Sequence, residues 1–160
     1  MKRWGIIPAV LLFLAAALMA QSASDQAASN GGDDPNANPP VTRVDVRIVQ
    51  RARKILNSPS KWNRADTRNC PADAATFSLY CALEKATKEV SGTFEHRGAA
   101  MQEARFVIDE IAPNAKSYEH RLMDYNNDTA TTFADVQKFF RLLEVRVRKR
   151  LVEQSQSRDK

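Results

Sequence analysis

Apolar residues recur at helical spacing through almost all of residues 41–154, and this pattern restricts the fold more than any other feature. No stretch shows the alternation of apolar and polar residues that a half-buried strand requires. The sequence therefore predicts an all-α domain, a compact bundle of about four helices. In the first helix, the apolar residues that share one face are Val41, Val44, Ile48, Ala52 and Ile55.

Residue types that commonly cap or stop a helix indicate where the first two helices begin and end. Thr42 and Asp45, three residues apart, can form a capping box at the start of the first helix. The second helix is expected to begin at Asp73, an N-cap residue type, and to stop at Gly92. Cys81 then lies inside the second helix, on its apolar side.

Two further helices follow the same logic. A third helix is expected over residues 98–112. Residues 114–132 are expected to be mostly irregular, with a helical part within 117–124. The last helix is expected to start at Thr132, with Asp135 as its capping partner.

The N-terminal part differs in composition from the domain. Residues 1–20 have a basic start, an uncharged apolar run and small residues at the end, which is typical of a secretory signal. Cleavage is expected after Ala20, with Ser24 as a second site, and an uncleaved membrane anchor is the alternative. Residues 21–40 lack large apolar side chains and are predicted to be a flexible tether. The protein is therefore expected to be exported, to the periplasm or outside the cell, with a domain over 41–154 and a flexible tail over 155–160.

The charge balance narrows the class of partner. Removal of the two basic residues in the leader lowers the formal net charge from +5 to +3, an excess too mild to indicate nucleic acid. The basic residues of the last helix, among them Arg148, Lys149 and Arg150, are expected to splay around it as a solvated face. Another envelope protein or an anionic envelope surface is the alternative partner, and no membrane-spanning helix is expected after processing.

The two cysteines, Cys70 and Cys81, allow several interpretations. An even number of cysteines in an exported chain favours a disulfide, which requires the preceding loop to fold back along the second helix. The alternative is a buried Cys81 and a free surface thiol at Cys70. His96 and His120 lack the paired spacing of zinc ligands, and nothing in the sequence places either beside a sulfur as a catalytic base.

Residues 124–135 resemble a calcium loop. Oxygen-bearing side chains occupy positions 1, 3, 5, 9 and 12 of a twelve-residue frame, as in an EF-hand. The turn glycine of that loop is replaced by Thr129, and an aspartate stands in place of its long glutamate. An Asx turn followed by a helix cap explains the same residues. The candidate ligands are Asp124, Asn126, Asp128, Thr132 and Asp135.

Three short sequences, "ILNSPSKW" (55–62), "CALEKA" (81–86) and "YNNDTATTFADV" (125–136), resemble a family of small, uncharacterised, mostly bacterial all-helical proteins. The resemblance covers most of 44–145. It departs from the family at Glu84, where glycine is frequent, and in the export signal. It implies a helical fold and no known activity. The positions that match are Pro59, Trp62, Cys81, Ala82, Leu83, Tyr125, Asn126, Thr132 and Asp135.

The functional hypotheses follow from what the sequence lacks. It contains no recognisable pair of catalytic acids, no phosphate-binding glycine loop and no nucleophile motif, so no catalytic residue and no cofactor is assigned. The leading hypothesis is a non-catalytic, exported interaction or envelope-associated domain. The alternatives are a calcium-binding module and a metal-dependent or hydrolase-like enzyme that uses the 124–128 loop with His120 or His96. A concave pocket shared by Glu119, His120, Asp124 and Asp128 would favour the enzyme.

Overall fold

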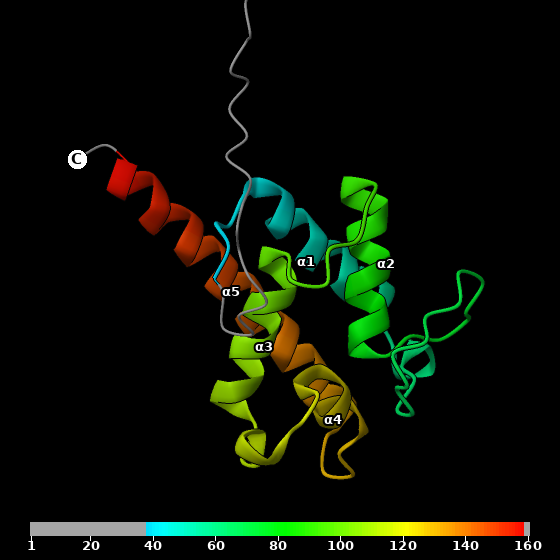
Figure 1. The fold of residues 1–160 in the computed structure, drawn as a ribbon. Coiled ribbons are helices and arrows are strands. Elements are labelled where there is room, and N and C mark those ends of the chain that lie inside the picture. Colours follow the sequence, from blue (N-terminus) through cyan, green and yellow to red (C-terminus); the bar gives the residue numbers. More distant parts are fainter. Residues whose placement is uncertain (1–37, 159–160) are drawn as a thin grey trace, which may run out of the picture. The chain divides into compact units, whose positions relative to one another are not determined.

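The computed structural model describes residues 38–158. The predicted leader and residues 21–37 of the predicted tether lie outside the described residues. Within the described part the fold is all-α, as predicted, with one isolated β-bridge between Trp62 and Phe77 and no strand (Figure 1). The α-helices are α1 (Arg43–Ile55), α2 (Leu79–Ser91), α3 (Ala99–Ile111), α4 (Arg121–Asn127) and α5 (Phe133–Arg158), and the short 3₁₀ helices are η1 (Pro59–Lys61) and η2 (Ala115–Ser117).

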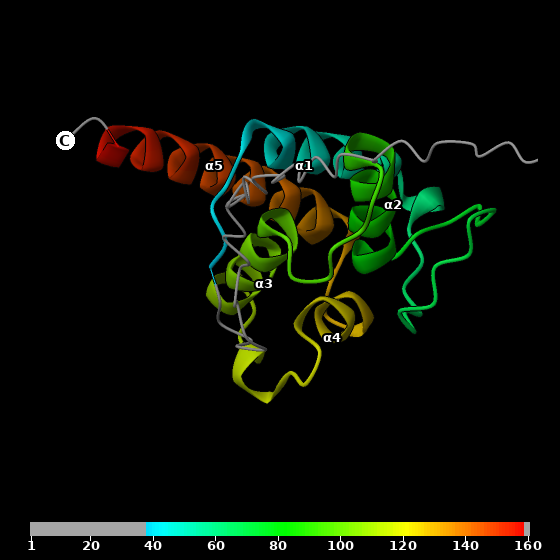
Figure 2. The ribbon, with the colours of Figure 1, turned by 45° about the horizontal axis from the view of Figure 1, so that its top comes forward.

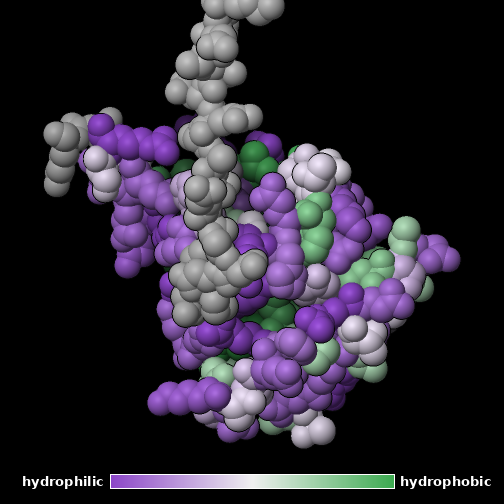
Figure 3. All heavy atoms as spheres, viewed as in Figure 1, coloured by the Kyte–Doolittle hydropathy of each residue, from purple (hydrophilic) through white to green (hydrophobic). Residues whose placement is uncertain are grey.

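The helices enclose one hydrophobic core. Helix α1 packs against α2 and α5, while α3 packs against α5 and α4. Figures 1 and 2 show α1 beside α5, and α4 below α2 and α3, against both of which it packs. The side chains of Phe139 and Phe140 on α5 are fully buried and meet edge to face, with ring centroids 5.1 Å apart. The outer surface in the view of Figure 3 is mostly hydrophilic, as expected when apolar side chains gather inside.

The predicted caps of the first and last helices are confirmed. Thr42 and Asp45 form the capping box of α1, and the carboxylate of Asp135 accepts hydrogen bonds from the backbone N–H and hydroxyl of Thr132. Helix α2 ends at Gly92, which has a φ of +85°. Glycine has no Cβ and adopts this left-handed conformation without strain, so the helix stops where the sequence predicts.

The predicted start of α2 at Asp73 is wrong. The helix begins at Leu79, and the hydroxyl of Ser78 caps it by accepting a hydrogen bond of 3.1 Å from the N–H of Cys81. The backbone of Phe77 pairs with the chain around Trp62 instead, because its N–H donates to the carbonyl of Lys61 at 2.8 Å. This long-range pairing keeps the residues before Ser78 out of the helix.

The segment between α3 and α5 contains more helix than predicted. It forms η2 and then α4, which begins after His120 and extends the expected helical part to Asn127. The carboxylate of Asp124 accepts a hydrogen bond of 2.7 Å from the backbone N–H of His120, which satisfies a free donor at the start of α4. The bundle therefore has five α-helices in its described part where about four were expected.

The last helix extends past the predicted end of the domain at residue 154. Helix α5 continues to Arg158, so the predicted flexible tail is helical up to that residue. The side chain of Gln154 accepts a hydrogen bond of 3.1 Å from the N–H of Val41, and Arg150 bonds to Asn38. The end of the predicted tether therefore packs on α5. Among residues 38–158, no helix has the length and apolar character needed to cross a membrane.

Candidate functional site

A pocket of about 720 Å³ lies between the N-terminal end of α2, the polar side of α3 and the segment that leads into α4. We call it the basic pocket, because its cationic residues outnumber its acidic ones. The acidic residues that line it are Asp109 and Glu119. The cationic residues that line it are Arg68, Arg97, Arg105, Lys116 and Arg121.

Helix geometry explains how α3 serves both the core and the basic pocket. Its apolar stripe faces the core, and Ala104, Val107 and Ile108 on that stripe are almost completely buried. Arg105 and Asp109, four residues apart, occupy another face and line the pocket. The pocket therefore uses the polar face of an amphipathic helix.

Three side chains form a hydrogen-bonded chain in the wall of the basic pocket. The guanidinium of Arg105 donates to Nε2 of His96 at 3.0 Å, and Nδ1 of His96 lies 3.3 Å from the hydroxyl of Tyr80. A guanidinium has only donors, so Nε2 must accept. The neutral His96 ring then carries its proton on Nδ1 and donates it to the oxygen of Tyr80.

The environment of this chain shifts the pKa of each member. Burial is the largest cause in all three cases: it raises the pKa of Tyr80 and lowers the pKa of His96 and of Arg105. The positive charge of Arg105 lowers the pKa of His96 further. Tyr80 is therefore a neutral hydroxyl and His96 a neutral ring near pH 7, while Arg105 stays protonated, as arginine does in proteins.

Arg105 has no carboxylate partner among residues 38–158. Its guanidinium donates to the side-chain oxygen of Gln102 at 3.1 Å and to the carbonyl of His96 at 3.0 Å. The carboxylate of Asp109 instead pairs with Arg121, 2.7 Å away. A half-buried guanidinium that faces a pocket without a neutralising carboxylate favours an anion there.

The opposite wall contains part of the predicted enzyme site. Glu119 and His120 line the basic pocket, but Asp124 and Asp128 are not among its lining residues. Asp128 accepts a hydrogen bond of 2.9 Å from the hydroxyl of Tyr118, and burial, followed by this bond, raises the pKa of Tyr118 to about 12. The four residues named for a hydrolase-like site are therefore divided between the pocket and another part of the fold.

The residues of the predicted calcium loop have other roles. Asp124 and Asn126 belong to α4, so the first positions of the frame are helical and form no loop. The side chain of Asn126 is buried, and its oxygen accepts hydrogen bonds from Nε1 of Trp62 at 2.8 Å and from the N–H of Leu79 at 3.1 Å. A buried amide oxygen with two donors has no lone pair left for an ion.

The other oxygen-bearing side chains in this region act as caps. Asp128 accepts from the N–H of Ala130 at 2.9 Å, and Thr132 and Asp135 form the cap of α5. Within residues 38–158, no group of three or more His, Cys, Asp or Glu residues is placed to hold a metal ion. The Asx turn and helix cap, which were the alternative to the calcium loop, describe the observed geometry.

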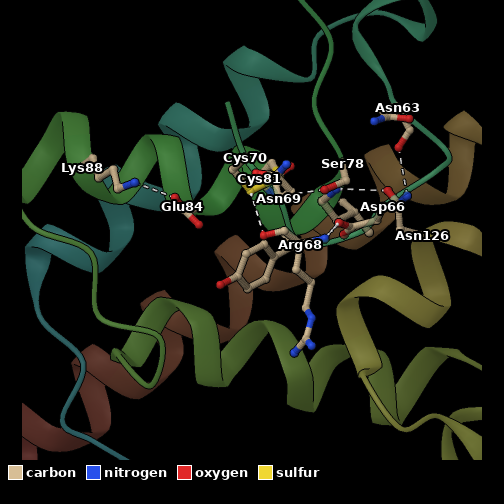
Figure 4. The surroundings of a disulfide bond; sticks show 12 residues. Asn63, Asp66, Arg68, Asn69, Cys70, Ser78, Cys81, Glu84, Lys88 and Asn126 are labelled. Atoms are coloured by element: carbon tan, nitrogen blue, oxygen red, sulfur yellow. Dashed lines mark hydrogen bonds and ion pairs between the residues drawn. A yellow bond between two sulfur atoms is a disulfide. The ribbon is translucent and has the colours of Figure 1, made fainter. Parts of the chain in front are cut away.

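Cys70 and Cys81 are joined in a disulfide, with their Cα atoms 5.3 Å apart. The loop before α2 folds back along the helix, and Cys81 Sγ lies 3.6 Å from the carbonyl oxygen of Asn69 (Figure 4). Free thiols at these two positions, which were the alternative, are therefore not present in the structure.

The basic residues of α5 are largely paired. Arg146 and Arg150 both bond to the fully buried carboxylate of Glu103 on α3, and Arg148 pairs with Glu144 one turn earlier at 2.8 Å. Arg148 and Lys149 are exposed, as expected for a solvated face, but Arg150 is not part of that face, because its side chain is only 17% exposed and bonds to Glu103. Four cationic residues without a carboxylate partner in the described chain, Arg68, Arg97, Arg105 and Lys116, line the basic pocket, where the sequence patterns did not indicate a site.

Comparison with known proteins identifies the family. No curated protein and no solved structure matches the chain. A protein family described as a family of unknown function (DUF6197) matches residues 40–144, which agrees with the resemblance over 44–145 to an uncharacterised helical family. The match covers the bundle from α1 to the middle of α5. The chain therefore belongs to this family of unknown function, DUF6197.

Proposed function

We propose that the domain is a non-catalytic binding module, exported from the cytoplasm, that holds an oxyanion-bearing ligand in the basic pocket. The half-buried guanidinium of Arg105, which has no carboxylate partner in the described chain, is the observation that carries the proposal. Its hydrogen bonds to Gln102 and His96 leave the positive charge without a carboxylate, so the guanidinium can bind a phosphate or carboxylate group.

The hydrogen-bonding chemistry of the basic pocket supports an acceptor-rich ligand. The hydroxyl proton of Tyr80 has no acceptor among the described residues, because the oxygen of Tyr80 already accepts from His96. Arg105 and Tyr80 therefore both offer donors to the pocket. The lining residues carry a formal net charge of +3 with neutral histidines, so the long-range field also favours an anion.

The volume of the pocket fits a small molecule or the end group of a larger one. About 720 Å³ lies within the range of roughly 300–1,000 Å³ that is usual for small-ligand sites. Phosphate and carboxylate groups occur both on free metabolites and on envelope lipids and polymers. The shared chemistry is a negatively charged oxyanion, either phosphate or carboxylate.

Calorimetric titration of the domain with inorganic pyrophosphate, inorganic phosphate and citrate tests the proposal. We expect saturable binding, strongest for the multiply charged probes and weakened by added NaCl. Arg105→Gln should weaken binding by about tenfold or more, because a charge-assisted hydrogen bond is lost. Arg141→Gln removes the same charge from the exposed surface of α5 and should change the affinity for the probes little.

Two results would overturn this function. One is the absence of saturable binding for all three probes, and the other is an equal effect of the Arg105 and Arg141 substitutions. If the probes bind, anionic phospholipid vesicles and soluble probes can be compared in competition. Displacement by the vesicles would indicate a lipid head group, and displacement by soluble anions alone would indicate a metabolite.

Export is a separate part of the proposal. It is supported by the signal-like composition of residues 1–20 and by the disulfide between Cys70 and Cys81. Mass spectrometry of the protein from its native cells should show a chain that begins at Gln21 or, with the second cleavage site, near Ser24. A full-length chain in the cytoplasm would contradict export and leave the pocket chemistry unaffected.

A further inference from the structure

The disulfide lies two residues from a cation of the basic pocket. Arg68 lines the pocket, and Cys70 in the same loop is bonded to Cys81 in α2. Figure 4 shows the guanidinium of Arg68 pointing away from the disulfide, toward α3. After burial and Arg105, the positive charge of Arg68 adds to the lowering of the pKa of His96, and it opposes the rise that burial causes in the pKa of Tyr80, so it acts on the same wall as Arg105.

The backbone of Arg68 is held in an unfavourable conformation. Its φ is +59°, and it is the one non-glycine residue with positive φ in the part of the chain that the structure describes. Such a conformation persists when neighbouring interactions hold it in place, and it frequently occurs at ligand sites. The position of the Arg68 side chain therefore depends on what holds the loop at each end.

Two anchors hold this loop, one on each side of Arg68. On the N-terminal side, the N–H of Asp66 donates to Asn127 at 2.7 Å, and the carboxylate of Asp66 accepts from the N–H of Arg68, also at 2.7 Å. On the C-terminal side, the disulfide of Cys70 ties the loop to α2. Reduction of the disulfide removes the second anchor and leaves the first.

The disulfide is accessible to a reductant. A second pocket of about 240 Å³ is lined by Cys70 and Cys81 together with Lys85 and Lys88. The two lysines pair with Glu89 and Glu84 respectively, on the exposed side of α2. Glu84 and Glu89 line the same pocket, so its charges balance, and the opening at the two cysteines is what lets a thiolate reach a sulfur.

We propose that the oxidation state of Cys70–Cys81 controls the anion affinity of the basic pocket by positioning Arg68. This inference rests on the proposed function. A dithiol reductant supplies two electrons and two protons: its thiolate attacks one sulfur, the Cys70–Cys81 bond breaks, and the products are two cysteine thiols and the reductant as a disulfide. The oxidised domain binds the anion more tightly, because Arg68 is held toward the pocket.

A double-mutant cycle with pyrophosphate as the probe tests the coupling. The four proteins are the oxidised wild type, Arg68→Gln, Cys70→Ser/Cys81→Ser, and the triple variant. We expect Arg68→Gln to weaken binding about three- to tenfold in the oxidised protein, as the loss of an exposed charged contact does. Removal of the disulfide should weaken pyrophosphate binding by a similar factor. In the protein without the disulfide, Arg68→Gln should then change the affinity little further.

Wild-type protein reduced by a phosphine gives the same comparison without mutation, and circular dichroism of the reduced protein checks that the domain is still folded. Affinity unchanged by reduction, or an Arg68→Gln effect of the same size with and without the disulfide, would overturn the coupling and leave the anion site in place. Absence of pyrophosphate binding by the oxidised wild type, with citrate and phosphate also inactive, would overturn the proposed function itself.

Discussion

The indole Nε1 of Trp62 donates a hydrogen bond of 2.8 Å to the side-chain oxygen of Asn126, which is completely buried. The same oxygen accepts from the N–H of Leu79 at the start of α2, and the amide nitrogen of Asn126 donates to the carbonyl of Asn63 at 2.9 Å. One side chain of α4 therefore joins the loop after α1 to the first turn of α2. The loop that carries Arg68 runs between these two points.

Asn126→Ala should lower the free energy of unfolding by about 2–4 kcal/mol, because buried donors and an acceptor lose their partner. Urea unfolding followed by circular dichroism measures the change. Asn57→Ala removes an exposed amide after α1 and should alter stability by less than about 0.5 kcal/mol. Equal effects of the two substitutions would mean that the Asn126 network does not hold the loop.

Glu103 offers a second stability test, with a matched control. Its carboxylate is fully buried and bonds to Arg146 and Arg150, so Glu103→Ala should cost about 3–5 kcal/mol. Glu110 also bonds to Arg146, but its side chain is 61% exposed, and Glu110→Ala should cost less than about 1 kcal/mol. Comparable losses in urea unfolding would contradict the difference that burial predicts.

The disulfide closes a short loop, since its cysteines are 11 residues apart in sequence. Removal by Cys70→Ser/Cys81→Ser should lower the free energy of unfolding by about 2–3 kcal/mol, through greater freedom of the unfolded chain. Intact mass after alkylation should show no modified cysteine without reductant and two modified cysteines with it. Two modifications of the folded, unreduced protein would exclude the bond.

The lowered pKa of His96 predicts a pH dependence of stability. The folded domain binds the His96 proton less strongly than the unfolded chain, so this contribution to stability is present above the unfolded pKa of about 6.5. It is lost as the pH falls below that value toward the lower folded pKa. The difference in unfolding free energy between the wild type and His96→Gln should therefore shrink between about pH 7.5 and pH 5. A difference that does not vary with pH would contradict the shift.

Much of the fold could be predicted because its signals are local. The stripe from Val136 to Val147 and the cap formed by Thr132 and Asp135 depend on residues three or four apart, which one helix brings together without help from the rest of the chain. The start of α2 was mispredicted because Phe77 pairs with Lys61, and no pattern around Asp73 signals a partner sixteen residues away. Asn126 fitted a calcium frame by spacing, although its true partners are Trp62 and Leu79.

The candidate site depends on distances between residues that are far apart in the sequence, and the spacing of residues along the sequence does not give these distances. Arg105 lies on the polar face of α3, where an arginine is common. It becomes a candidate binding group only because the fold places His96 and Tyr80, from other parts of the chain, next to it. The helical periodicity, the caps and the paired cysteines follow from short-range sterics, hydrogen bonding and composition. Packing between helices decides the basic pocket, the role of Asn126 and the placement of Arg68 near the disulfide. The physical reason is that burial, and whether a cation has a carboxylate partner, depend on which residues are close in space.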